Sequence, residues 1–163
     1  APGSPWAIVA AATPDVLEGR FDDAEKRFRQ ALKADPRYVP ALNSLAGLEL
    51  RRAFAESDPA KREARLQAAR ELLQSALEIE PDSTDALSRL ALLEGVAGNN
   101  DKSLALCDQA IALDPDDPQP FIVRANARLT AGRVEDARED LIRALTLHPN
   151  DEDTRAMFDS LNQ

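Results

Sequence analysis

The stretch Gly98–Pro115, GNNDKSLALCDQAIALDP, recurs in outline as GRVEDAREDLIRALTLHP at Gly132–Pro149 and as GRFDDAEKRFRQALKADP at Gly19–Pro36. A fourth copy, ARLQAARELLQSALEIEP, ends at Pro81 but lacks the opening glycine. From Pro81 onward the closing prolines are 34 residues apart, whereas the first two are 45 residues apart. This period predicts a repeat array, and the longer interval indicates one insertion of eleven residues.

Each copy has the pattern of an amphipathic helix followed by a stop. In the first copy, Ala24, Phe28, Ala31 and Leu32 recur at helical spacing and predict a buried stripe. The closing proline has no N–H and cannot continue a helix, so a turn and a second helix are expected after it. Small residues surround one larger residue at matching places, which favours close helix packing. These sets are Ala24/Phe28/Ala31, Ala69/Leu73/Ala76, Ser103/Cys107/Ala110 and Ala137/Leu141/Ala144.

Over roughly residues 19–150 the sequence resembles the tetratricopeptide repeat family, in which each repeat is an antiparallel pair of helices. The family places an aromatic residue or Leu three residues before Leu-Gly or Leu-Ala in the first helix. That pattern is matched by Leu42/Leu45/Ala46 and Leu87/Leu90/Ala91, and in part by Phe121/Ala125. Departures from the family are Arg124, where Leu is preferred, and Glu49, Glu94 and Arg128, where Tyr is usual. The resemblance implies an all-α fold, an α-solenoid wound as a right-handed superhelix, with about four repeats and a capping helix.

Three parts are expected along the chain. Residues 1–18 form an N-terminal segment, 19–150 the repeat array, and 151–163 a C-terminal capping helix. The insertion lengthens both helices of the second repeat, with Ser57 or Asp58 as the cap at the tip. The expected helices lie near 21–34, 38–55, 60–79, 84–96, 100–113, 118–130 and 134–147, with a short cap near 152–161.

The N-terminal segment admits three interpretations. It is a degenerate or kinked first helix that contains Pro14, or a helix that begins at Thr13, or an apolar segment, 6–9, that docks on another surface. It lacks the basic start and the length of a signal peptide or a membrane span. We therefore expect no membrane insertion, and the sequence shows no targeting signal that would assign a compartment.

Composition limits the possible functions. Of the 163 residues 44% are hydrophobic but only 4% are aromatic, which predicts a core of Leu and Ala within one domain. A net charge of −9 argues against nucleic acid as a partner, because phosphates require basic patches. Acidic residues gather at expected helix starts, where they favour the helix dipole; an acidic ligand site is the alternative.

The sequence offers no catalytic or metal-binding set, so we expect neither an enzyme nor a cofactor. Cys107 and His148 are the only residues of their types, and Cys107 lies on an apolar stripe, where burial as a small filler is expected. No Gly-rich phosphate loop is present, since Gly19, Gly98 and Gly132 are explained as turn residues.

The resemblance implies a non-catalytic protein-interaction module, whose first helices line a concave groove for a segment of a partner protein. Homo-oligomerisation or assembly within a larger complex is the alternative. The repeat register places ten residues in or beside the groove: Asn43, Gly47, Leu50, Arg51, Ser88, Arg89, Leu92, Ile122, Asn126 and Leu129. In some family members Lys and Asn clamp a C-terminal carboxylate, and only the Asn element is present here. We therefore expect a segment with apolar side chains; the alternative is that the leucines and Ile122 belong partly to the core.

The second repeat also carries the one locally basic region of the chain. Its cations are Arg51, Arg52, Lys61, Arg62, Arg65 and Arg70. One interpretation is a solvated face interlaced with Glu56, Glu63 and Glu71. The other is a contact point for an acidic partner.

Overall fold

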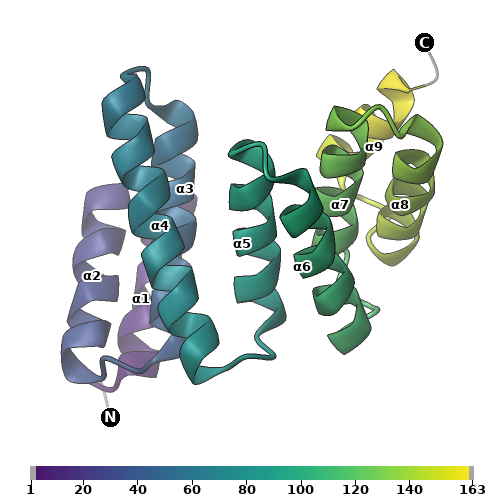
Figure 1. Ribbon diagram of the computed structural model, residues 1–163. Helices are drawn as coiled ribbons and strands as arrows, with labels where there is room; N and C mark the ends of the chain where they lie inside the picture. Colours follow the sequence, from purple (N-terminus) through teal and green to yellow (C-terminus); the bar gives the residue numbers. More distant parts are fainter. Residues whose placement is uncertain (1–2, 162–163) are drawn as a thin grey trace. The chain divides into compact units, whose positions relative to one another are not determined.

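The computed structural model describes residues 3–161, and this part of the chain is all helical, with no strand (Figure 1). Its helices are α1 Pro5–Leu17, α2 Phe21–Ala34, α3 Val39–Ala55, α4 Pro59–Ile79, α5 Thr84–Val96, α6 Asn100–Leu113, α7 Gln119–Thr130, α8 Val134–Leu147 and α9 Glu152–Ser160. The seven helices expected from the repeat register are present, and their ends agree to within one residue. The prediction of an all-α fold of helix pairs is confirmed. Residues 1–2 and 162–163, which the expected N-terminal segment and capping helix include, lie outside the described range.

The turns within the helix pairs follow the expected chemistry. Gly19, Gly98 and Gly132 adopt positive φ angles of 74°, 81° and 73°, a left-handed conformation that side chains disfavour. The second pair has Asp58 at this place instead. The Oδ1 atom of Asp58 accepts hydrogen bonds from the backbone N–H groups of Ala60 and Lys61, at 2.9 and 3.2 Å, and so caps α4.

The chain divides into two compact units, and the first, Ala1–Pro81, contains α1 to α4. Within it α1 packs on α2, α3 packs on α4, and both helices of the first pair contact α3. One core cluster joins Ala12, Ala24, Phe28, Leu45 and Leu48, and a second joins Ile8, Ala31 and Ala41. Leu73 of α4 is fully buried, as the small-large-small pattern predicts.

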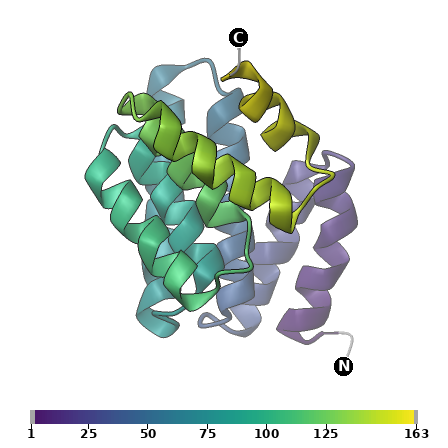
Figure 2. The ribbon, with the colours of Figure 1, turned by 90° about the vertical axis from the view of Figure 1, so that its right-hand side faces the viewer.

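The second unit, Asp82–Gln163, contains α5 to α9. The pairs α5/α6 and α7/α8 pack internally, α7 contacts α5 and α6, and α9 contacts α8. Figure 2 shows α8 (yellow-green) with α9 (yellow) beside it. A core cluster of Ala125, Ala137 and Leu141 receives Met157 and Phe158 of α9 together with Leu161.

The first helix, α1, differs from two of the interpretations left open by the sequence. It begins at Pro5, where the Ser4 hydroxyl accepts a hydrogen bond from the Ala7 N–H at 3.4 Å, and it runs through Pro14. A helix start at Thr13 is therefore wrong, and so is a loose apolar segment at 6–9. The helix tolerates Pro14, although this residue donates no hydrogen bond, because Ile8 and Ala12 pack into the two cores of the unit.

Candidate interaction surfaces

The ten residues expected in a groove lie on three helices, which belong to different units. Asn43, Gly47, Leu50 and Arg51 are on α3, in the first unit. The other six are on α5 and α7, which contact each other within the second unit. We therefore treat the α3 residues and the α5–α7 residues as separate surfaces.

On α3, only one of the four predicted residues presents its side chain to solvent. Asn43, Gly47 and Leu50 are buried, whereas Arg51 is exposed. Of the four predicted positions on α3, only the cationic one is therefore available to a partner.

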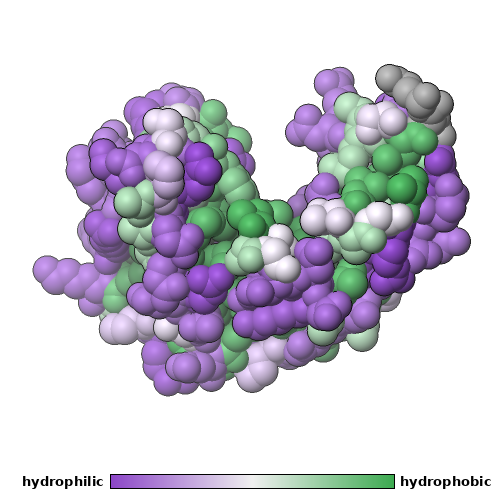
Figure 3. Space-filling view, turned by 45° about the horizontal axis from the view of Figure 1, so that its top comes forward, coloured by the Kyte–Doolittle hydropathy of each residue, from purple (hydrophilic) through white to green (hydrophobic). Residues whose placement is uncertain are grey.

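On α5 and α7 the predicted apolar residues are partly exposed. Leu92 is half-buried against the cluster of Ala91, Cys107 and Val123, and Leu129 is half-buried against the cluster around Leu141. Ile122 is also half-buried. These side chains thus contribute to the core and also reach the surface. In Figure 3 hydrophobic residues (green) are visible over α7 to α9, at right, next to hydrophilic ones.

Polar residues accompany this apolar row. Asn126 is exposed, and its side-chain N–H donates to the Ile122 carbonyl oxygen at 3.2 Å; its amide oxygen accepts no hydrogen bond within the described residues. Arg89 donates from Nε to Asp85 at 2.7 Å, so its charge is partly neutralised. Ser88 is buried, and its hydroxyl has no hydrogen-bond partner in the described part of the chain.

Sequence reasoning missed Val96, the last residue of α5, which is 48% exposed. It lies four residues after Leu92, and residues four apart share a helix face. The helical spacing was therefore a sufficient signal. We call Arg89, Leu92, Val96, Ile122, Asn126 and Leu129 the α5–α7 surface.

Two of the charged residues that replace the family's Tyr, both glutamates, are buried and paired. Glu49 contacts Arg65 of α4 at 3.0 Å, and Glu94 contacts Lys102 of α6 at 2.9 Å. In each case an ion pair connects the first helix of the pair to the second. A buried charge requires such a partner, because desolvation penalises the charged form.

The first pair contains an equivalent residue that the sequence analysis did not single out. Asp15 lies 34 residues before Glu49 and is 5% exposed. It contacts Arg20 at 2.7 Å and Arg27 of α2 at 2.8 Å. The hydrogen bond from Arg20 lowers the pKa of the Asp15 carboxyl, and the charges of both arginines act in the same direction.

In the last pair the charges are reversed, because the first helix supplies the cations and the second helix the carboxylate. Arg128 of α7 and Arg124, one turn earlier, both donate to Asp140 of α8, at 2.6 and 2.7 Å, and Asp140 is 3% exposed. Arg124 also contacts the exposed Asp108 of α6. Burial would lower the pKa of Arg124, but its hydrogen bonds to Asp140 and Asp108 outweigh this and raise it. Arg124 thus joins three helices where the family has Leu.

Cys107 is fully buried, as predicted, and burial raises the pKa of its thiol to about 12, so the thiolate is scarce at neutral pH.

Among the described helices, none has both the length and the apolar character of a membrane span.

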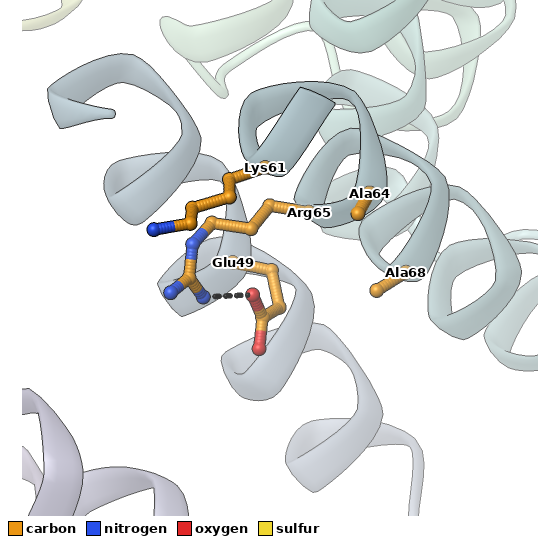
Figure 4. A pocket seen from close by; sticks show the side chains of 5 residues that line it. All are labelled: Glu49, Lys61, Ala64, Arg65 and Ala68. Atoms are coloured by element: carbon orange, nitrogen blue, oxygen red, sulfur yellow. Dashed lines mark hydrogen bonds and ion pairs between the residues drawn. The ribbon is translucent and has the colours of Figure 1, made fainter. Parts of the chain in front are cut away.

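In the first unit, α3 and α4 form an open pocket near the end of their hairpin (Figure 4). It is lined by Glu49 of α3 and by Lys61, Ala64, Arg65 and Ala68 of α4, and its volume is about 280 Å³. Lys61 and Arg65 extend over the same side of α4 in this view.

The helix pairs, their internal turns and their packing define a helical-repeat protein of the α-solenoid class. Models of the tetratricopeptide repeat match residues 18–53 and 60–127. The chain belongs to the tetratricopeptide repeat family.

Solved structures share this fold. A thermophilic tetratricopeptide repeat protein of Thermus thermophilus is 24% identical, with a TM-score of 0.86 over 98% of this chain and 82% of that one. The protein pilF of Pseudomonas aeruginosa is 18% identical, with a TM-score of 0.77 over 96% of this chain and 67% of that one. YrrB, described as a tetratricopeptide repeat protein with an unusual peptide-binding site, is 18% identical, with a TM-score of 0.66 over 95% and 74%. No curated protein sequence matches the chain.

Proposed function

We propose that this chain is a non-catalytic scaffold that binds a segment of a partner protein along the α5–α7 surface. Tetratricopeptide repeats in general support a protein-interaction scaffold, and YrrB is described as having a peptide-binding site. The observation that carries the proposal is the row of partly exposed apolar side chains on two adjacent helices, Leu92 and Val96 on α5 and Ile122 and Leu129 on α7.

The chemistry of this surface suits an apolar segment rather than a chain terminus. Apolar side chains of the partner would cover the row, and the free amide oxygen of Asn126 would accept a backbone N–H. The helices α3, α5 and α7 contain no Lys, so a Lys and Asn clamp on a C-terminal carboxylate is not part of the proposal. Arg89 adds little steering because Asp85 already neutralises part of its charge.

The proposal is tested by selecting ligands from a displayed random-peptide library and measuring their affinities. The variant Leu92→Glu/Ile122→Glu places two carboxylates in the row and should weaken a selected peptide about tenfold or more. Ile142→Glu is the matched control, since Ile142 is an exposed apolar residue of α8 in the same unit. Circular dichroism checks the fold of each variant.

Asn126→Ala gives a second variant, at an exposed position where folding should be unaffected. It should weaken the same peptides by removing the amide acceptor. Selected peptides that bind both variants as tightly as the Ile142→Glu control would place the binding site elsewhere.

An assembly role is the alternative, and one observation favours it. Trp6 and Leu17 of α1 are 69% and 81% exposed, which is unusual for large apolar side chains. They lie eleven residues, or three turns, apart and so share one side of the helix. A second copy of the chain covering this side would give a molar mass that rises with concentration in light scattering, and Trp6→Ser should then restore the monomer.

A further inference from the structure

The insertion in the second repeat makes the α3–α4 hairpin longer than its neighbours. The helices α3 and α4 have 17 and 21 residues, whereas α5 and α6 have 13 and 14. Arg52 of α3 contacts Asp22, at 2.5 Å, and Glu25, both in the first two turns of α2. The residues of the hairpin beyond Arg52 therefore extend past the start of α2. We call residues 49–68 the hairpin end.

The pocket at the hairpin end lies on a face of α4 that, further along the helix, packs against the core of the first unit. Lys61, Ala64, Arg65 and Ala68 follow one another at helical spacing on α4. One turn further on the same face, Leu72 packs against the core cluster built by α1, α2 and α3. Nearer the tip this face is open, and the small side chains of Ala64 and Ala68 leave a hollow at the helix backbone (Figure 4).

Most carboxylates of the hairpin end already accept hydrogen bonds within the hairpin. Glu49 is held by Arg65, Asp58 caps α4, and the Glu56 carboxylate accepts from the Asp58 N–H at 3.2 Å. Glu63 lies two residues from Lys61, about 200° around the helix, and so faces away from the pocket.

The cationic side chains near the pocket have N–H groups that form no hydrogen bond with the described residues. Within the described residues, the ammonium group of Lys61 and the guanidinium of Arg51 have no hydrogen-bond or ion-pair partner, and both side chains are exposed. Arg65 uses only its Nη1 atom on Glu49, which leaves further N–H groups of its fork free. The open side of the pocket is therefore positively charged, in a chain whose net charge is −9.

We propose that the pocket at the hairpin end binds a carboxylate side chain from an acidic segment of a partner protein. The carboxylate lies between the Lys61 ammonium and the free N–H groups of Arg65, and its methylene groups rest on Ala64 and Ala68. Glu49 is a positioning residue, because its ion pair holds the Arg65 guanidinium at the mouth of the pocket. Arg51, on the neighbouring helix, attracts further acidic residues of the same segment.

The test uses the full chain labelled with ¹⁵N and a synthetic peptide of alternating Glu and Ala. Amide shifts should change in the pocket residues 61–68 as the peptide is added to millimolar concentration. A peptide of alternating Gln and Ala, which has the same length without charge, should cause no change there. Raising the salt concentration should weaken binding of the acidic peptide, because exposed charges are screened.

Two charge reversals make the test specific. Lys61→Glu should weaken the acidic peptide about tenfold, whereas Lys33→Glu, at an exposed position of α2 in the same unit, should change it less than about twofold. Three results would each overturn the proposal: no shift change in residues 61–68, equal binding of the Gln peptide, or equal loss in the two variants. The α5–α7 surface lies in the other unit, so failure here leaves the proposed function standing.

Discussion

At the residue scale, a charged side chain recurs at one position of every helix pair. Asp15, Glu49, Glu94 and Arg128 are separated by 34, 45 and 34 residues, so the repeat period and the single longer interval of the closing prolines recur here in another order. Each is paired with a residue from the second helix of its own pair. Such a pair contributes little over an apolar contact, but loss of one partner leaves a buried charge uncompensated. The pairs therefore fix which residues of the two helices face each other.

The first prediction concerns the pH dependence that follows from Asp15. Its pKa in the folded protein is below the ordinary 3.8, so ionised Asp15 stabilises the fold above that pH, and the contribution is lost as pH falls through the folded-state pKa. Asp15→Asn should therefore unfold at a lower urea concentration than the wild type at neutral pH. The difference should shrink as pH falls below 3.8.

Urea titrations of both proteins across this pH range provide the measurement. Asp23→Asn serves as the control, since Asp23 is exposed and its side chain pairs, among the described residues, only with Lys26. A difference between Asp15→Asn and the wild type that stays constant down to the most acidic pH would show that the Asp15 charge is not responsible.

At the scale of the element, the last helix pair depends on a single buried carboxylate. Asp140 of α8 accepts hydrogen bonds from Arg124 and Arg128 of α7, and Arg124 also reaches α6 through Asp108. The guanidinium of Arg124 lies 5.5 Å from the Phe121 ring centroid, within the range of a cation–π contact. Without Asp140, Arg128 would have no carboxylate partner among the described residues, and Arg124 would keep only the exposed Asp108.

We therefore expect Asp140→Ala to destabilise the protein by about 3–5 kcal/mol, the usual range when one partner of a buried pair is removed. Asp108→Ala removes an exposed acceptor of the same Arg124 and should cost no more than about 1 kcal/mol. Chemical denaturation of both variants measures the difference. Similar losses for the two would mean that burial does not distinguish these carboxylates.

At the scale of the whole molecule, the repeat organisation makes stability local, since each repeat packs chiefly on its neighbours. Leu73 of α4 is fully buried, so Leu73→Ala should cost about 2–5 kcal/mol. Hydrogen exchange should accelerate most in α3 and α4 and least in α8 and α9. The exposed Glu139→Ala should change stability by less than about 0.5 kcal/mol. Uniform acceleration along the chain would indicate one cooperative unit instead.

The sequence by itself was sufficient to predict the helices. Apolar periodicity, the closing prolines and the turn glycines are local signals. The succession of helix pairs and the lengthening of both α3 and α4 could therefore be predicted from them. The start of α1 was harder to predict, because Pro14 is unfavourable locally and only the packing of Ile8 and Ala12 against other helices compensates for it.

Only the tertiary structure decided which side chains reach solvent and which charges meet. Gly47, Leu92 and Asn126 occupy the same repeat position, yet they are buried, half-buried and exposed, because exposure depends on which helices cover each one. The sequence marked Glu49, Glu94 and Arg128 as departures from the family but not as ion pairs. Their partners lie 8 to 16 residues away on another helix, and only the packing of the two helices brings the opposite charges together.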